Sequence, residues 1–146
     1  MVRGGRGREA ERYVMERIDV LPGWSAVDAN AARLNQPGFD VIARHDGGRD
    51  IHVSVKSKTT GGGRLSFEIG RSFRRHPADV YAFVDTTQAE PWLVYLAGAW
   101  TVERLALERH SKYQSDRGGN PDGLNSWSPC CSPRSSCPAS RTVCAL

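Results

Sequence analysis

The sequence predicts an α/β fold, a sandwich in which a mixed β-sheet is flanked by helices. Two observations predict it. First, apolar residues recur at helical spacing near both ends of the probable core. Second, the segments between these ends contain apolar residues that alternate with polar ones or form continuous runs of strand length. The chain has 146 residues, of which 39% are apolar and 25% charged, so we expect one domain with one core.

The first element is an amphipathic helix over Arg8–Leu21, because apolar residues recur there every three or four positions. Pro22 and Gly23 end this helix. The residues Trp24–Ala29 alternate between apolar and polar and predict a first strand. A loop with a Pro-Gly turn at positions 37 and 38 follows.

Two further strands are expected at Phe39–Ala43 and Ile51–Lys58, joined by the polar turn HDGGRD. A polar, glycine-containing turn between two such runs is typical of an antiparallel hairpin. Side chains alternate between the two faces of a strand, so Ile51, Val53 and Val55 are expected in the core. The other face of the second strand carries His52, Ser54, Lys56 and Lys58.

The middle of the chain predicts a loop followed by short elements. Thr60–Gly63 is a glycine-rich loop, and Leu65–Ile69 forms a short strand or leads into the next helix. Gly70–His76 is expected to be a short helix that Pro77 closes.

The last part of the core predicts two strands and a helix. Asp79–Asp85 and Trp92–Leu96 are apolar runs of strand length, typical of central strands that are buried on both faces. Thr101–Arg109 is expected to be a helix, with Thr101 as its N-cap.

Residues 111–146 differ in composition from the rest of the chain. All four cysteines lie between positions 130 and 144, in a Ser- and Pro-rich segment without a hydrophobic period. Such a segment cannot bury enough apolar surface to offset the entropy that is lost when a chain becomes ordered. We therefore expect an α/β domain over residues 1–110 and a disordered tail over residues 111–146.

Charge and hydropathy restrict the partners of the chain. No apolar run approaches the roughly 20 residues that cross a bilayer, and no apolar signal core follows the basic start. We therefore expect a cytoplasmic protein with no membrane partner. The net charge is +4, and two basic groups are either phosphate contacts or solvated surface. These groups are Arg3, Arg6, Arg8 and Arg12, and Arg71, Arg74 and Arg75 with His76.

Asp40 is the lone acid in its predicted strand, across the hairpin from Lys56. An acid inside a strand is disfavoured by propensity and costly to bury, so it needs a partner or a chemical role. One interpretation is a cross-strand ion pair between Asp40 and Lys56 at a sheet edge. The other is a catalytic site that contains both residues.

The order of charged residues resembles the PD-(D/E)XK nuclease superfamily, over about residues 4–97. Glu11 lies in the first helix, Asp40 follows a Pro-Gly turn, and Lys56 stands in VSVKSK. The resemblance implies the restriction-endonuclease-like fold, a three-layer sandwich with a central mixed sheet flanked by helices. It also implies an endonuclease that hydrolyses phosphodiester bonds of DNA with Mg²⁺ (or Mn²⁺).

The resemblance also implies roles for individual residues. Asp40 would be the central metal ligand and the Val55 carbonyl a second one. Lys56 would orient water or stabilise charge, and Glu11 would act on the metal through water. Many enzymes of this fold work as dimers, so a homodimer is a further expectation.

The chain departs from the family at Ser54, where the family has an acid two residues before the lysine. A neutral hydroxyl at this catalytic position should weaken divalent-metal affinity, because ligand charge sets much of that affinity. Glu68 is the candidate to supply the missing carboxylate to the metal. The residues expected to contact DNA phosphates are Arg71, Arg74 and Arg75.

Two other functions remain open from the sequence. The chain could keep the nuclease fold, lose the reaction and bind nucleic acid or a protein partner. It could also be a plain α/β interaction domain.

Overall fold

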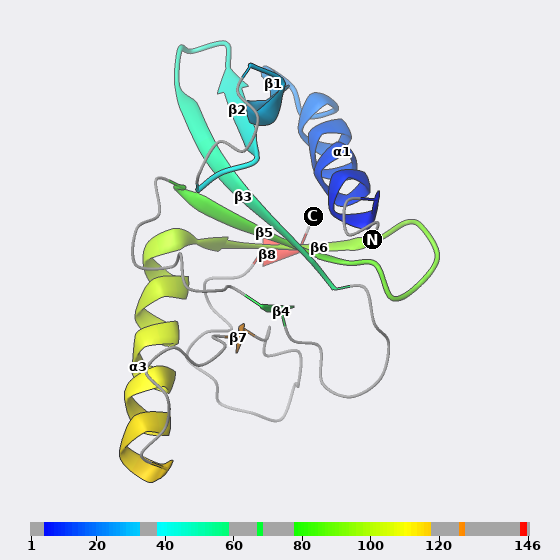
Figure 1. Cartoon of the computed structure of the whole chain (residues 1–146). Coiled ribbons are helices and arrows are strands. Elements are labelled where there is room, and N and C mark those ends of the chain that lie inside the picture. The colour runs from blue at the N-terminus through cyan, green and yellow to red at the C-terminus, as the bar shows by residue number, and fades with distance from the viewer. Residues whose placement is uncertain are drawn as a thin grey trace.

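The computed structural model of the chain describes residues 5–32, 38–58, 67–68, 78–117, 126–127 and 144–145. Figure 1 shows the arrangement of their helices and strands. In chain order the elements are α1 (Gly5–Asp19), β1 (Trp24–Asp28), α2 (Ala29–Ala32), β2 (Val41–His45), β3 (Asp50–Lys58), β4 (Phe67–Glu68), β5 (Val80–Asp85), β6 (Leu93–Gly98), α3 (Ala99–Arg117), β7 (Ser126–Trp127) and β8 (Cys144–Ala145).

The main sheet is mixed and has the strand order β1-β2-β3-β5-β6-β8. β1, β2 and β3 pair antiparallel, β5 is parallel to β3, and β6 is antiparallel to β5. The predicted hairpin is therefore confirmed, and so is the α/β class with a mixed sheet. β4 pairs with β7 in a second, two-stranded sheet.

The core consists of two clusters on opposite faces of the main sheet. Along β5, Ala82 and Val84 belong to the cluster with α1, whereas Tyr81 and Phe83 belong to the cluster with α3. Because side chains alternate along a strand, α1 and α3 cover different faces. All four of these side chains have no exposed area, which confirms β5 as a strand buried on both faces.

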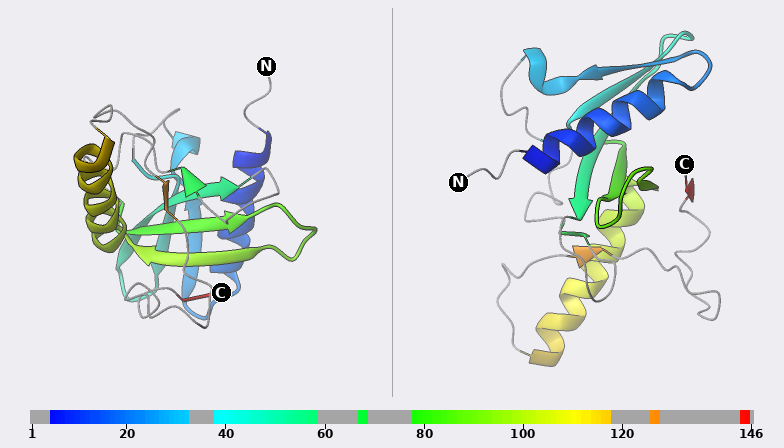
Figure 2. Two further views of the ribbon diagram at one scale, coloured as in Figure 1. Left: turned by 90° about the horizontal axis from the view of Figure 1, so that it is seen from below. Right: turned by 90° about the vertical axis from the view of Figure 1, so that its right-hand side faces the viewer.

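α1 packs along β1 and β3 (Figures 1 and 2). Its buried residues lie at helical spacing: Ala10, Tyr13, Val14 and Ile18. Tyr13 also reaches beyond the sheet, because its hydroxyl donates to the Trp92 carbonyl at 3.1 Å. This docking positions the backbone of α1 over the sheet.

Several element boundaries differ from the sequence prediction. α1 ends at Asp19, whose carboxylate accepts the Ala26 N–H of β1 at 2.7 Å, and not at Leu21. β2 begins at Val41, two residues later than predicted. The short helix α2 was not predicted, and it includes the first residues of the segment that was expected to be a loop.

The last helix is longer than predicted. α3 begins at Ala99, so Thr101 lies inside the helix and the prediction that it is the N-cap is wrong. The Ala99 N–H donates to the Asp79 carbonyl at 2.9 Å, which joins the start of α3 to the start of β5. At its other end α3 continues to Arg117 and crosses the domain boundary that was expected at residue 110.

Some predictions fall on residues that the structure does not describe. These are the loop Thr60–Gly63, the helix Gly70–His76 and, apart from the end of α3, β7 and β8, the tail over residues 111–146. Of the segment Leu65–Ile69, Phe67 and Glu68 are described and form β4. Within the described ranges no helix is both long and apolar enough to cross a membrane.

The double burial of β5 predicts the stability effect of a core substitution. Val84→Ala removes two methyl groups from a side chain with no exposed area, and it should lower the free energy of unfolding by about 2 kcal/mol. Val20→Ala is the control, because Val20 is 73% exposed, and it should change this free energy by less than about 0.5 kcal/mol. Urea denaturation measures both. Equal stability of the two variants would contradict the description of β5 as the centre of the core.

Candidate active site

Asp40 lies directly before β2 and is held against the backbone of β3. Its Oδ2 accepts the Val55 N–H at 2.7 Å, and its own N–H donates to the Val53 carbonyl at 2.9 Å. On the other side, the Asp40 carbonyl accepts the Ala29 N–H at 3.0 Å. The half-buried carboxylate is therefore fixed beside Val55, the residue that precedes Lys56.

Glu11 projects from α1 and is half-buried. The pKa of Glu11 is raised to about 7. The largest cause is burial, and the negative charges of Asp40 and Asp28 add to it. The charges of Arg8 and Lys56 act in the opposite direction. Asp28 and Asp40 therefore lie within range for their charges to act on Glu11, and we call these three acids the carboxylate group.

Asp28 is the member of this group that the sequence analysis missed. It is the last residue of β1 and stands opposite Val41, a residue of the core cluster under α1. Residues opposite one another in a sheet share a face, so Asp28 faces α1. Its Oδ1 also accepts the Asn30 N–H at 2.8 Å, as expected of a side chain that caps α2. An acid directly before the helix-compatible run ANAA was the available signal.

Ser54 and Lys56 lie on the other face of β3. In the parallel pairing with β5, Ser54 stands opposite Tyr81 and Lys56 opposite Phe83, and both aromatic residues belong to the cluster with α3. Ser54 is almost completely buried, with 2% exposure, and Lys56 is half-buried. The prediction that Val53 and Val55 face the core is confirmed.

The cross-strand ion pair between Asp40 and Lys56 is not found among the ion pairs of the described residues. The Asp40 carboxylate is instead bonded to the backbone of Val55. Lys56 contributes to the group through its charge on Glu11 and not through a contact with Asp40. The interpretation of these two residues as a structural ion pair is therefore wrong.

The remaining predicted residues are not brought into this group by any described contact. The backbone of Glu68 lies in β4, but its side chain is outside the described part. The three arginines expected to contact DNA, Arg71, Arg74 and Arg75, also lie outside it. Within the described part, no three His, Cys, Asp or Glu side chains are gathered closely enough to enclose a metal ion.

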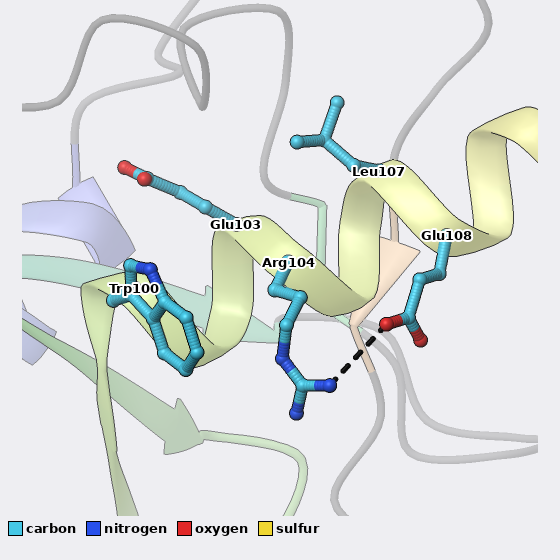
Figure 3. A pocket seen from close by; sticks show the side chains of 5 residues that line it. All are labelled: Trp100, Glu103, Arg104, Leu107 and Glu108. Atoms are coloured by element: carbon cyan, nitrogen blue, oxygen red, sulfur yellow. Dashed lines mark hydrogen bonds and ion pairs between the residues drawn. The ribbon is translucent and has the colours of Figure 1, made fainter.

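A shallow hollow lies elsewhere, on the outer surface of α3 (Figure 3). Arg104 lies over the ring of Trp100 and pairs with Glu108 at 3.3 Å, while Leu107 is exposed. Figure 3 shows these side chains projecting from one helix without converging on a common point. The hollow therefore has the character of ordinary helix surface, and the carboxylate group under α1 is the candidate site.

In comparisons with known proteins, no protein-family model, no curated protein and no solved structure matches the chain. The function must therefore be inferred from the residues themselves.

The raised pKa of Glu11 predicts a pH-dependent stability. Between its ordinary value of 4.5 and about 7, the folded protein binds a proton that the unfolded chain has released, so this side chain lowers stability as pH rises through that range. Glu11→Gln removes the effect. From about pH 4.5 to about pH 8, its stability should therefore increase relative to the wild type by about 1–2 kcal/mol, less than the full shift because of solvent screening.

Denaturation curves across this pH range measure the effect, and Glu16→Gln is the matched control on the same helix. Glu16 is exposed and pairs with Arg12, so its variant should follow the wild type. Parallel pH profiles for the two variants would contradict the account of Glu11.

Proposed function

We propose that this chain is a nuclease-fold domain that hydrolyses phosphodiester bonds of DNA with the help of Mg²⁺ or Mn²⁺. One observation carries the proposal: Glu11 is half-buried within range of the negative charges of Asp28 and Asp40, and its pKa rises to about 7. Partly buried carboxylates that repel one another bind either a proton or a cation. A site of this kind is suited to a divalent metal ion.

The fold supports the same proposal at a coarser level. A mixed sheet between α1 and α3 agrees with the three-layer arrangement that the resemblance to PD-(D/E)XK nucleases implies. The restriction-endonuclease-like fold itself is part of the proposal. So are DNA as the partner and a homodimer as the assembly.

The donor atoms suit Mg²⁺. This ion prefers hard oxygen ligands and usually keeps several waters, so one or two protein carboxylates and the substrate phosphate suffice. Asp40 and Glu11 supply the carboxylates. The N–H and C=O of one strand residue point to the same side, so the Val55 carbonyl is directed toward the side on which its N–H meets Asp40.

A bound Mg²⁺ would polarise the scissile phosphate and lower the pKa of a bound water. The protein's own residues would hold the reactants. The Val55 N–H fixes the orientation of Asp40, and the Glu11 carboxyl holds or releases a proton near neutral pH. The Lys56 ammonium would offset phosphate charge and orient the attacking water.

Ser54 favours a second candidate function. A buried neutral hydroxyl occupies the position of the family's second acid, and the side chain of Glu68 is not described. The alternative is a catalytically degenerate nuclease-fold domain that binds nucleic acid or a protein partner. It predicts DNA or protein binding without metal-dependent cleavage.

The first test concerns metal binding by Asp40. Asp40→Asn removes the charge but keeps an oxygen that can accept the Val55 N–H, so the fold should persist. Mg²⁺ and Mn²⁺ affinity, measured by titration calorimetry, should fall at least about tenfold, because ligand charge sets much of the affinity. Asp50→Asn at an exposed position is the control. Unchanged metal affinity in Asp40→Asn, with a normal thermal melt, would exclude the proposed centre.

The second test concerns Ser54. Ser54→Asp adds a carboxylate two residues before Lys56, and it should increase Mg²⁺-dependent nicking of plasmid DNA if the wild type lacks that charge. The gain should vanish in the double variant with Lys56→Ala. If Glu68 already supplies the charge, the wild type should cut, and Glu68→Gln should inactivate it.

Ser54 is buried, so the added volume and charge will lower stability, by about 1–3 kcal/mol for the overpacking alone. A melting curve must therefore accompany each assay, and Ser54→Asn is the neutral control of similar size. If neither the wild type nor a folded Ser54→Asp protein cuts any form of DNA, the degenerate, binding-only domain becomes the better description.

A further inference from the structure

Two arginines of the basic group at the start of the chain have different neighbours in the structure. Arg8 and Arg12 are both exposed on α1, about one helical turn apart. Arg12 pairs with Glu16 at 3.6 Å, so an opposite charge already lies beside it. No ion pair of the described residues includes Arg8. The guanidinium of Arg8 is therefore available to a ligand.

Arg8 lies on the exposed side of Glu11. The two residues are three positions apart on α1, a spacing that makes helical side chains neighbours. Around the helix, Glu11 comes between Arg8 and the side that Ala10 and Val14 bury against the sheet. The positive charge of Arg8 also acts on Glu11, because it lowers the pKa that burial and the acidic neighbours raise. A ligand that approaches Glu11 from solvent therefore meets Arg8.

The direction of α1 places Arg8 at the same end of the sheet as the carboxylate group. α1 and β1 run in opposite directions (Figure 2, right), and the Asp19 carboxylate near the end of the helix accepts the Ala26 N–H. A step back along α1 from Asp19 therefore corresponds to a step forward along β1 from Ala26 toward Asp28. Glu11 and then Arg8 follow in that direction.

A cation at this place would offset a repulsion. The carboxylate group holds three acids, and the phosphates of DNA are also negative, so their approach costs energy unless positive charge lies nearby. An arginine suits this role, because its planar guanidinium can form two parallel hydrogen bonds to the oxygens of one phosphate. The exposure of Arg8 leaves it accessible to a ligand as large as DNA.

We propose that Arg8 binds a backbone phosphate of DNA beside the carboxylate group. The inference rests on the proposed function, since it assigns the DNA to the α1 side of the sheet, where the carboxylate group lies. Arg8 contacts the substrate and holds the strand near Glu11 and Asp40. It thereby separates Arg8 from Arg12, which remains ordinary helix surface.

The first test compares matched arginine variants of the full chain. Anisotropy measures the binding of a fluorescently labelled DNA duplex over a range of salt concentrations, with a chelator present to prevent cleavage. The slope of log affinity against log salt should be smaller in magnitude by about 0.9 in Arg8→Gln, because one phosphate contact is lost. Arg12→Gln is the control on the same helix and should keep the wild-type slope. A wild-type slope in Arg8→Gln, or an equal reduction in both variants, would overturn the inference.

Arg8→Lys tests whether the positive charge itself is responsible. Lysine keeps this charge and is compatible with a helix, so the variant should retain the wild-type salt slope even if its affinity falls. A slope as small as that of Arg8→Gln would assign the effect to a change in α1 and contradict the phosphate contact. Thermal melts should show that all three variants fold, because both substituted arginines are exposed.

Amide chemical shifts locate the DNA on the chain. Addition of the duplex to the isotope-labelled protein should shift the amide signals of Arg8 and Glu11 more than those of Leu107 and Glu108. The latter two belong to α3, which covers the opposite face of the sheet. If the largest shifts of this set occur on α3, the placement of DNA beside Arg8 is wrong.

The outcomes separate this inference from the proposed nuclease. If the wild type binds and cuts DNA but Arg8→Gln keeps the wild-type slope, the phosphate contact is wrong and the nuclease proposal stands. If the slope depends on Arg8 but no metal-dependent cleavage occurs, the contact is supported and the nuclease proposal fails. If the folded wild type neither binds nor cuts DNA, with or without Mg²⁺, both are overturned.

Discussion

Burial of β5 on both faces is the constraint on which the rest of the structure depends. Four consecutive side chains of this strand have no exposed area, so each face of the sheet must be covered. α1 covers one face and α3 the other. The candidate site depends on α1. This helix covers the sheet and also places Glu11 in a half-buried position within range of the charges of Asp28 and Asp40.

Two carboxylates of the site experience different environments. Asp40 compensates for its partial burial by accepting a backbone N–H from Val55. No hydrogen-bond donor to the Glu11 carboxylate is found among the described residues, and burial together with the charges of Asp40 and Asp28 raises its pKa to about 7. One acid is therefore held in place by a backbone amide, while Glu11 can exchange a proton near neutral pH. This division of roles follows from which side chain reaches a backbone donor.

Sequence periodicity predicted the elements that depend on repeated burial, namely α1, β3 and β5, to within a few residues. It missed α2 and the length of α3, because neither depends on a periodic apolar face along its whole length. In the site, Glu11 and Asp40 were identified through the family resemblance. Asp28 was missed because its place in the group arises from the pairing of β1 with β2. Of the two interpretations of Asp40 and Lys56, the ion pair was wrong, because the Asp40 carboxylate accepts the Val55 N–H instead.

The parallel pairing of β3 with β5 has a consequence for how the chain assembles and varies. Antiparallel neighbours can be joined by a tight turn, whereas parallel ones need a long crossover, here residues 59–79. Contacts that span such a distance in sequence slow folding, because closing a long segment of chain costs entropy. Glu11, Asp28, Asp40 and Lys56 all precede the crossover, so the charged centre is encoded in one contiguous, locally connected stretch of chain. Insertions or substitutions in the crossover can therefore accumulate during evolution without altering the order or spacing of these four residues.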